Sequence, residues 1–298
     1  MVYTKQGNGN LKTPETNSKE INYIINELNL SARVWNNPSP KNDVTVLAIH
    51  GWLDNANSFS FLAPLLEAKQ VIALDLPGHG FSDHRPTDED YNITKYVEEL
   101  IDLIKEGSLE KPLALIGHSL GGGISTLVAS HPGNHFEQLI LLDALGPYSS
   151  DTDPDKQILY EKNTKVSKTT YPSFQAAVTR RTTTLTGKIS QEDAISLAER
   201  GLQLAKEGYR WRHDSKLLLK TARMTEKEVL DAIKNIKIPV CIIEAKKGIL
   251  RKFPAFQNRL DAIVDLTHHV IDGGHHFHMS DQCNAAAQLI NQFLRRIP

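Results

Sequence analysis

The stretch Gly117-His118-Ser119-Leu120-Gly121 decides how the chain folds, because it reads G-x-S-x-G where a strand should turn into a helix. Residues 112–116, just before it, form an apolar run of strand length. After it, apolar side chains recur at the spacing of one buried helix face: Leu120, Ile124, Leu127 and Val128. So tight a turn leaves no room for side chains beside the serine. The pattern predicts a nucleophile elbow with Ser119 at a helix N-terminus; a plain glycine-rich turn with a capping serine is the alternative.

Outward from this turn, buried strands alternate with helices. Nearly continuous apolar runs at 44–49, 71–74 and 138–142 are typical of strands covered on both faces. Amphipathic patterns at 58–68 and 97–104 predict helices between them. This alternation predicts an α/β fold with a mostly parallel central sheet and helices on both faces. Ligands bind such sheets at the carboxyl ends of the strands, where four polar side chains follow the apolar runs: His50, Asp75, Ser119 and Asp143.

The strand pattern is interrupted by one long insertion. Residues 146–224 contain no buried strand run. They predict a helical lid over the strand ends, with an amphipathic helix at 194–205 and an aromatic-basic turn at 208–214. Residues 21–145 and 225–298 are then expected to form a single core domain.

The two ends of the chain differ in character. Residues 1–20 are polar and predict a flexible tail, and 21–37 predict two short strands that pair as a hairpin. Near the C-terminus, 267–271 predicts a last strand, which leads into Gly273-Gly274-His275-His276-Phe277-His278. An amphipathic face at 286–297 predicts a closing helix.

Composition argues against several classes of protein. The formal net charge is −1, and the charges are spread along the chain, so there is no basic stripe for nucleic acid. No apolar run is long enough to cross a bilayer, and the N-terminus lacks a signal-peptide hydrophobic region. Cys241 and Cys283 are predicted to be buried thiols in a reducing compartment. We therefore expect a cytoplasmic protein with a small-molecule partner; the sequence does not indicate its oligomeric state.

Ser119 needs a base that takes its proton, because a serine hydroxyl alone is a poor nucleophile. The loop after the last predicted strand can reach over the elbow, and His275 follows its glycine pair directly. We therefore predict His275 as the base, with His276 and His278 as the alternatives. His118, inside the elbow, is expected to point away and to pack or form hydrogen bonds.

Four motifs together resemble the α/β-hydrolase superfamily. They are the His-Gly pair at 50–51, D-x-P-G-H-G-x-S at 75–82, G-H-S-x-G-G at 117–122 and G-G-H-x-x-H at 273–278. The wording of 50–56 and 142–147 is similar to that of the serine hydrolase-like proteins. The resemblance spans nearly the whole chain from about residue 20. It implies acyl chemistry, since the elbow carries a serine where dehalogenases and epoxide hydrolases carry an aspartate.

The sequence departs from the superfamily pattern at the acid that orients the histidine. Relatives usually carry this acid shortly after the strand that follows the lid, and here Gly248 stands at that place. A minority arrangement puts the acid at the end of the strand after the nucleophile helix, where this chain has Asp143. We therefore predict a Ser119-His275-Asp143 triad. The alternatives for the acid are Glu244, Asp272, Asp265 or none.

The remaining site predictions concern the oxyanion and the substrate. The elbow geometry makes the amide of Leu120 one oxyanion donor, and the resemblance implies the amide of Trp52 as the other. The Trp52 indole is either a wall of the acyl pocket or a core aromatic. Trp211 is either a substrate contact or part of the packing within the lid. For a charged substrate, the candidate cations are Arg180, Arg181, Arg210 and Arg212.

These residues predict a serine hydrolase that cleaves carboxylic esters through an acyl-enzyme. Fold and triad do not separate this from a C–C bond hydrolase, a lactonase or an acyltransferase. A non-catalytic member that binds a small ligand is the alternative of another class. No cofactor is expected, since the glycines at 121–123 lack the lysine of a phosphate loop. No metal is expected either, because no carboxylate or cysteine stands at ligand spacing from the histidines at 275–278.

Overall fold

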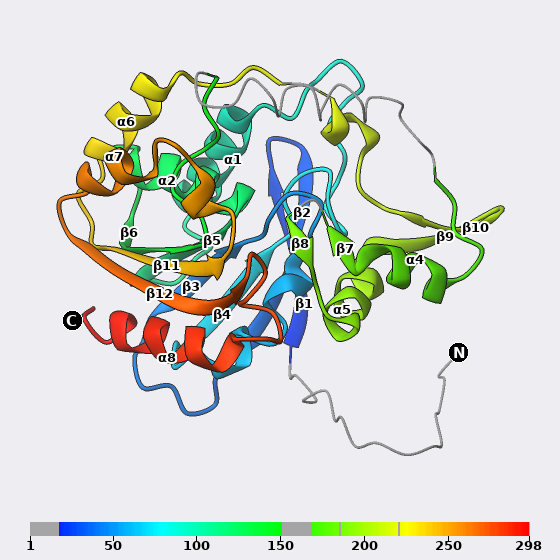
Figure 1. Ribbon diagram of the computed structural model, residues 1–298, viewed down its shortest axis with the longest axis horizontal. Helices are drawn as coiled ribbons and strands as arrows, with labels where there is room; N and C mark the ends of the chain where they lie inside the picture. The colour runs from blue at the N-terminus through cyan, green and yellow to red at the C-terminus, as the bar shows by residue number, and fades with distance from the viewer. Residues whose placement is uncertain (1–17, 151–168, 185, 220, 298) are drawn as a thin grey trace.

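The computed structural model describes residues 18–150, 169–184, 186–219 and 221–297. Its centre is one eight-stranded sheet in the order β1-β2-β4-β3-β5-β6-β11-β12 (Figure 1). The strands are β1 (Ser18–Ile25), β2 (Leu28–Asn36), β3 (Thr45–Ile49), β4 (Gln70–Leu74), β5 (Leu113–His118), β6 (Phe136–Leu142), β11 (Val240–Lys247) and β12 (Leu266–Gly274). The pairs β1–β2 and β2–β4 are antiparallel, and all the others are parallel. The predicted α/β fold, with its opening hairpin, is therefore confirmed.

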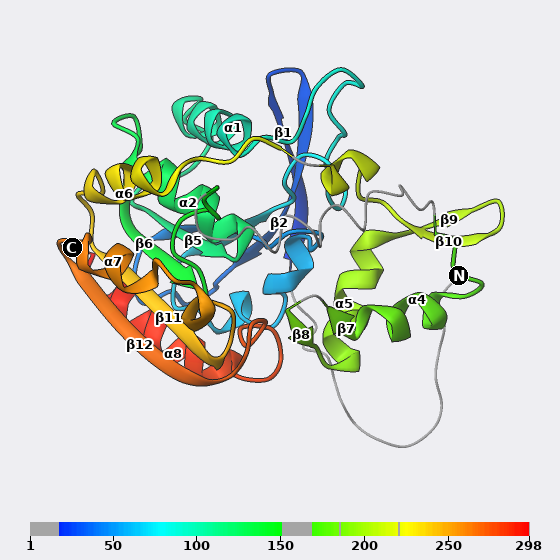
Figure 2. The same cartoon turned by 45° about the horizontal axis from the view of Figure 1, so that its top comes forward.

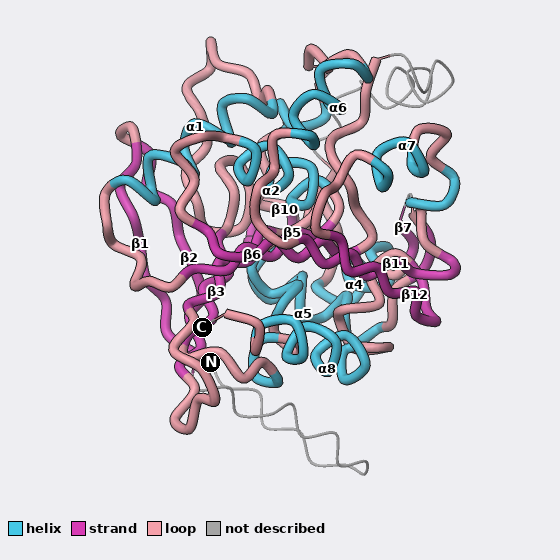
Figure 3. The backbone as a smooth tube through the Cα atoms, turned by 90° about the vertical axis from the view of Figure 1, so that its left-hand side faces the viewer, coloured by secondary structure: helices cyan, strands magenta, loops and turns pink. Residues whose placement is uncertain are grey.

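Helices cover both faces of the sheet, as Figure 3 shows. One face carries α1 (Ile93–Lys105), α2 (Leu120–Ser130), α6 (Glu226–Lys234) and α7 (Phe256–Asp261), and the other carries α8 (Cys283–Leu294). Each face has its own apolar core. In β3, Leu47 and Ile49 join the core under α1 and α2, while Val46 and Ala48 join the core under α8. This is why the strand sequence is apolar at every position.

The stretch at 58–68 was expected to be one helix, and that prediction is wrong. The structure has two short 3-10 helices there, η1 (Ala56–Phe59) and η2 (Ala63–Leu65). The side chain of Asn55 caps η1 by accepting from the backbone N–H of Asn57. Pro64 has no N–H and disfavours a continuous α-helix through this stretch, so the chain makes separate turns.

The segment between β6 and β11 forms a small lobe beside the sheet (Figure 2). Its described part contains α4 (Phe174–Arg181), α5 (Gln191–Gly201), two hairpins and η3 (Ser215–Leu218). The hairpins are β7 (Thr183–Thr184) with β8 (Gly187–Lys188), and β9 (Leu202–Ala205) with β10 (Gly208–Trp211). A cluster of buried side chains holds the lobe together, including Ala177, Val178, Leu197 and Leu202.

Two predictions for this lobe need correction. The helix expected at 194–205 ends at Gly201, where the chain turns into β9, and the expected turn at 208–214 begins with β10. A glycine is a poor helix former, which favours the helix end at this point. At the N-terminus, β1 begins at Ser18, inside the stretch expected to be a tail. Residues 1–17 and 151–168, predicted as tail and lid, lie outside the described residues.

The lobe contacts the loops at the carboxyl ends of β3 and β4. Asn55 donates to the carbonyl of Leu197 (2.9 Å), and Asn57 donates to that of Ser196 (2.8 Å). The short helix η4 (Leu250–Lys252) follows β11 at the same edge of the sheet. Within the described ranges, no helix is long and apolar enough to span a membrane.

Candidate active site

Ser119 sits at the sharp turn between β5 and α2, in a strained backbone conformation. Its φ of 52° and ψ of −116° lie where side chains are rarely accommodated. A Cβ at Gly121 would lie 2.2 Å from the carbonyl oxygen of Ile49, and one at Gly117 would lie 2.5 Å from that of Gly121. Only glycine fits at these two positions. The packing therefore holds the turn that presents the half-buried serine at the helix N-terminus.

His275 and Asp143 form a short, buried hydrogen bond. Nδ1 of His275 lies 2.6 Å from Oδ2 of Asp143, and both side chains are almost completely buried. Since a carboxylate can only accept, Nδ1 carries the proton and Nε2 is left as the basic lone pair. Burial lowers the pKa of His275, and the hydrogen bond to Asp143 opposes this by raising it. The imidazole is therefore neutral near pH 7 and able to accept a proton.

The position of Asp143 explains the glycine at position 248. The carboxylate accepts from the backbone N–H groups of Ala245 (3.2 Å) and Ile249 (2.9 Å). A Cβ at Gly248 would lie 2.2 Å from Oδ2 of Asp143. The aspartate thus fills the space that a side chain at position 248 would need. Its φ of 45° shows that the end of β6 bends to bring it there.

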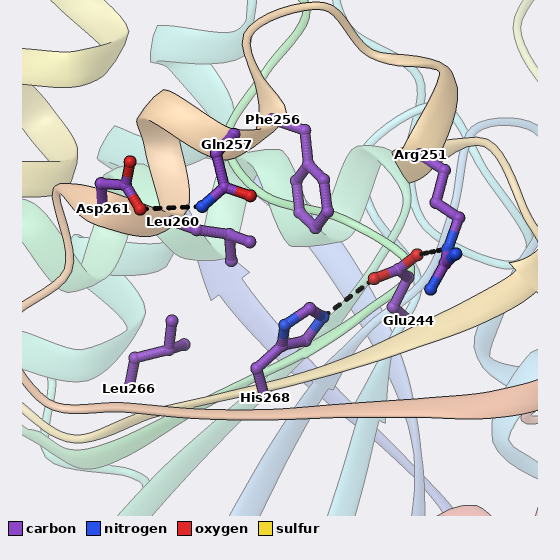
Figure 4. Close-up of a pocket in the computed structure, with 8 residues that line it drawn as sticks. All are labelled: Glu244, Arg251, Phe256, Gln257, Leu260, Asp261, Leu266 and His268. Atoms are coloured by element: carbon purple, nitrogen blue, oxygen red, sulfur yellow. Dashed lines mark hydrogen bonds and ion pairs between the residues drawn. The ribbon is translucent and has the colours of Figure 1, made fainter.

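Glu244, the first alternative for the acid, faces another part of the molecule. Its carboxylate pairs with Arg251 and accepts from Nε2 of His268 (2.9 Å), in a pocket between α7 and the strands β11 and β12 (Figure 4). The other two alternatives, Asp272 and Asp265, form ion pairs with basic side chains at the surface. Of the four candidate carboxylates, Asp143 alone has a hydrogen bond to the predicted base within the described residues.

Four histidines gather around the elbow. Nε2 of His118 donates to the carbonyl of His275 (3.1 Å), so the residue before the nucleophile contacts the loop that carries the predicted base. The His118 ring also lies 5.0 Å from the ring of His276 and 4.2 Å from that of His278. Burial lowers the pKa of His278 to about 3. His118 therefore packs and forms a hydrogen bond, as expected, and brings Ser119 and His275 into one site.

Asp54 belongs to this cluster, although the sequence did not point to it. It follows Trp52 in the loop after β3 and is buried. Arg181 of α4 binds one of its carboxylate oxygens. The other oxygen faces His118 and His276. A contact between segments so far apart along the chain leaves no local spacing signal, which is why it was missed.

The predicted oxyanion donors and substrate contacts lie around the same turn. Leu120 is the first residue of α2, where a backbone N–H has no partner within the helix. Trp52 lies in the turn after β3, and its indole donates to the carbonyl of Leu217 in the lobe (3.2 Å). The Trp211 ring lies so close to Gly201 that a Cβ there would be 2.8 Å away. Trp211 thus packs within the lobe.

His50 and Asp75 hold the loops at the strand ends. His50 is buried, donates to the carbonyl of Gly51 (2.7 Å) and accepts from the N–H of Leu76 (3.0 Å). Asp75 accepts from the N–H groups of Ala56 and Phe81, both at 2.7 Å. These two side chains fix the loop positions and make no contact with the predicted triad among the hydrogen bonds described above.

Comparison with known proteins adds an independent line of evidence. The family described as "alpha/beta hydrolase fold" matches residues 44–282. A serine hydrolase-like protein of Dictyostelium discoideum is 30% identical over 300 residues, which cover 94% of this chain and 82% of that protein. The crystal structure of a hypothetical protein from Pseudomonas aeruginosa PAO1 is 33% identical, with a TM-score of 0.78 over 92% of this chain and 97% of the other. A thioesterase domain from the curacin biosynthetic pathway is 25% identical, with a TM-score of 0.75 over 92% and 99%.

Proposed function

The chain belongs to the α/β-hydrolase family, and from this premise we propose that it is a serine hydrolase that cleaves carboxylic esters through an acyl-enzyme on Ser119. The observation that carries the proposal is the 2.6 Å hydrogen bond between His275 and Asp143, beside a strained elbow. A buried imidazole with one nitrogen held by a carboxylate is the arrangement that a serine nucleophile requires.

In the first half of the reaction, the Ser119 hydroxyl attacks the ester carbonyl carbon while Nε2 of His275 takes its proton. The carbonyl oxygen becomes an oxyanion, which the amides of Leu120 and Trp52 stabilise; each such donor lowers the barrier by roughly 3 kcal/mol. The C–O bond to the alcohol then breaks. The alcohol leaves with the proton from His275, and the acyl group stays on Ser119.

In the second half, water takes the place of the alcohol. His275 accepts a proton from water as the oxygen attacks the acyl carbon, and it returns that proton to the serine oxygen when the acyl bond breaks. Asp143 stays ionised throughout, keeps the proton on Nδ1 and stabilises the imidazolium. The lobe within residues 146–224 acts as a lid that selects the substrate.

A thioester is the second candidate substrate, because one structural relative is a thioesterase domain. The same triad attacks an ester or a thioester carbonyl, and only the leaving group differs. The bond that is cleaved therefore depends on the pocket and not on the triad.

The test is labelling with a fluorophosphonate probe, followed by intact mass and peptide mapping. An activated serine reacts without its natural substrate being known. We expect one adduct, on Ser119, and none in Ser119→Ala, with the fold of that variant unchanged by circular dichroism. Panels of short- and medium-chain esters, thioesters and lactones then identify the bond. A folded wild-type protein without an adduct would favour the ligand-binding member of the fold.

A further inference from the structure

Three possible ligand atoms converge beside the elbow, on side chains that the acyl chemistry does not use. One atom each from Asp54, His118 and His276 lies within 4.8 Å of the others. Oδ2 of Asp54 lies 3.7 Å from Nδ1 of His118 and 3.5 Å from Nε2 of His276. Two ligands bound to one zinc ion at about 2.1 Å and at the tetrahedral angle are roughly 3.4 Å apart. Two of the three separations are thus already close to those around a coordinated ion.

Two of these atoms are buried and have no hydrogen-bond partner among the described residues: Oδ2 of Asp54 and Nδ1 of His118. Because Nε2 of His118 donates its proton to the carbonyl of His275, Nδ1 carries a lone pair. A carboxylate oxygen and an imidazole lone pair therefore face each other away from water. Such a pair is costly to bury, and a cation between the two atoms would stabilise it.

The contacts behind these atoms are those found behind metal ligands. A ligating histidine usually donates its other N–H to a carbonyl or carboxylate, and ligating carboxylates are themselves hydrogen-bonded. His118 donates to a backbone carbonyl, and the second oxygen of Asp54 binds Arg181. Gly51 leaves the space open: a Cβ there would lie 2.9 Å from Nδ1 of His118 and 3.0 Å from Oδ2 of Asp54.

We propose that Asp54, His118 and His276 form a site for one divalent transition-metal ion, represented by Zn²⁺. Two imidazoles and one carboxylate suit zinc, nickel, copper or iron, whereas magnesium and calcium prefer oxygen ligands alone. Three protein ligands leave a fourth position for water. The ion would join the loop after β3, the end of β5 and the loop after β12. The site replaces the sequence-based expectation of no metal, which rested on the missing carboxylate.

The test is metal binding by the untagged full-length protein after treatment with a chelator. Isothermal titration with Zn²⁺ should give one site per chain, and Co²⁺ should give visible absorption bands of a coordinated ion. His276→Gln and Asp54→Asn should each weaken binding by more than about tenfold. His268→Gln is the matched control, because it removes a histidine paired with a buried carboxylate elsewhere, and it should bind as wild type does.

The readout is independent of the proposed hydrolase reaction, so Ser119→Ala should bind zinc as the wild type does. Absence of saturable zinc binding and of cobalt bands in folded wild-type protein would overturn the site; a proton between Asp54 and His276 then accounts for the cluster. Unchanged binding in His276→Gln would overturn it as well. If Asp54→Asn fails to fold, the partly exposed His276 decides the matter, since its substitution disturbs the core least.

Discussion

Asp143 is the side chain on which the orientation of His275 depends. Three donors converge on its carboxylate, namely the imidazole and the two backbone amides of Ala245 and Ile249. The amides hold the carboxylate in place before the imidazole binds, so the base is positioned by the backbone of β11 and of the loop that follows it. Glu244 sits next to this backbone, but its side chain points to the opposite face.

Asp143→Asn should reduce turnover of an ester substrate by about 10⁴-fold, because the amide favours the wrong imidazole tautomer. Glu244→Gln is the matched control and should change turnover by less than about tenfold, since its carboxylate has other partners. Steady-state kinetics on both variants measures the difference. If the larger loss occurs in Glu244→Gln, the acid lies on β11 and the assignment of Asp143 is wrong.

The segment that joins β10 to η3 links the lobe to the core. The N–H of Asp214 donates to the carbonyl of Gly78 (2.8 Å), and the carboxylate of Asp214 accepts from the hydroxyl of Tyr91 (2.8 Å). His213 lies within this link. Burial lowers the pKa of His213 to about 4, with the nearby charge of Arg181 acting in the same direction. The link therefore depends on a neutral imidazole.

Acid should weaken this link through His213. The unfolded imidazole binds a proton near pH 6.5 and the folded one only near pH 4, so the unfolded state holds more protons between these values. Stability is complete above pH 6.5 and falls as the pH drops towards 4, by up to about 3 kcal/mol. His213→Asn should show a flatter pH dependence in urea unfolding from pH 7 to 4. His135→Asn, at an exposed position, serves as the control, and equal slopes for the two variants would contradict the prediction.

At the scale of the molecule, Arg200 of α5 ties the lobe to three parts of the core. Its guanidinium binds Asp75 after β4 (2.7 Å), Glu20 on β1 (2.8 Å) and Ser31 on β2 (3.2 Å). Arg200 and Asp75 are both buried. Removal of one partner from a buried pair leaves an uncompensated charge, so this contact matters far more than a surface ion pair.

Arg200→Leu should lower the free energy of unfolding by about 3–5 kcal/mol, because Asp75 stays buried without its cation. Lys227→Ala is the control: it removes an exposed pair with Asp231 and should cost less than about 1 kcal/mol. Urea denaturation of both variants gives the comparison. Equal losses would show that the lobe is held mainly by its other contacts.

The sequence predicted the sheet well, because strands buried on both faces are apolar at every position, as 44–49 is. It also predicted the partners of the hydrogen bond between His275 and Asp143, since each follows the end of a strand. Long-range polar contacts were beyond it. Asp54 meets Arg181 and the histidines only after the lobe has packed on the core, and no local pattern records that contact.

The packing of Asp143 against Gly248 also constrains how this family member can vary. An aspartate at position 248 would put a second carboxylate into occupied space, and loss of Asp143 alone would leave the base without its acid. Each single change is harmful, while the two together exchange one arrangement for the other. The two positions therefore show reciprocal sign epistasis: a lineage passes between the arrangements only through a defective intermediate or by both changes at once.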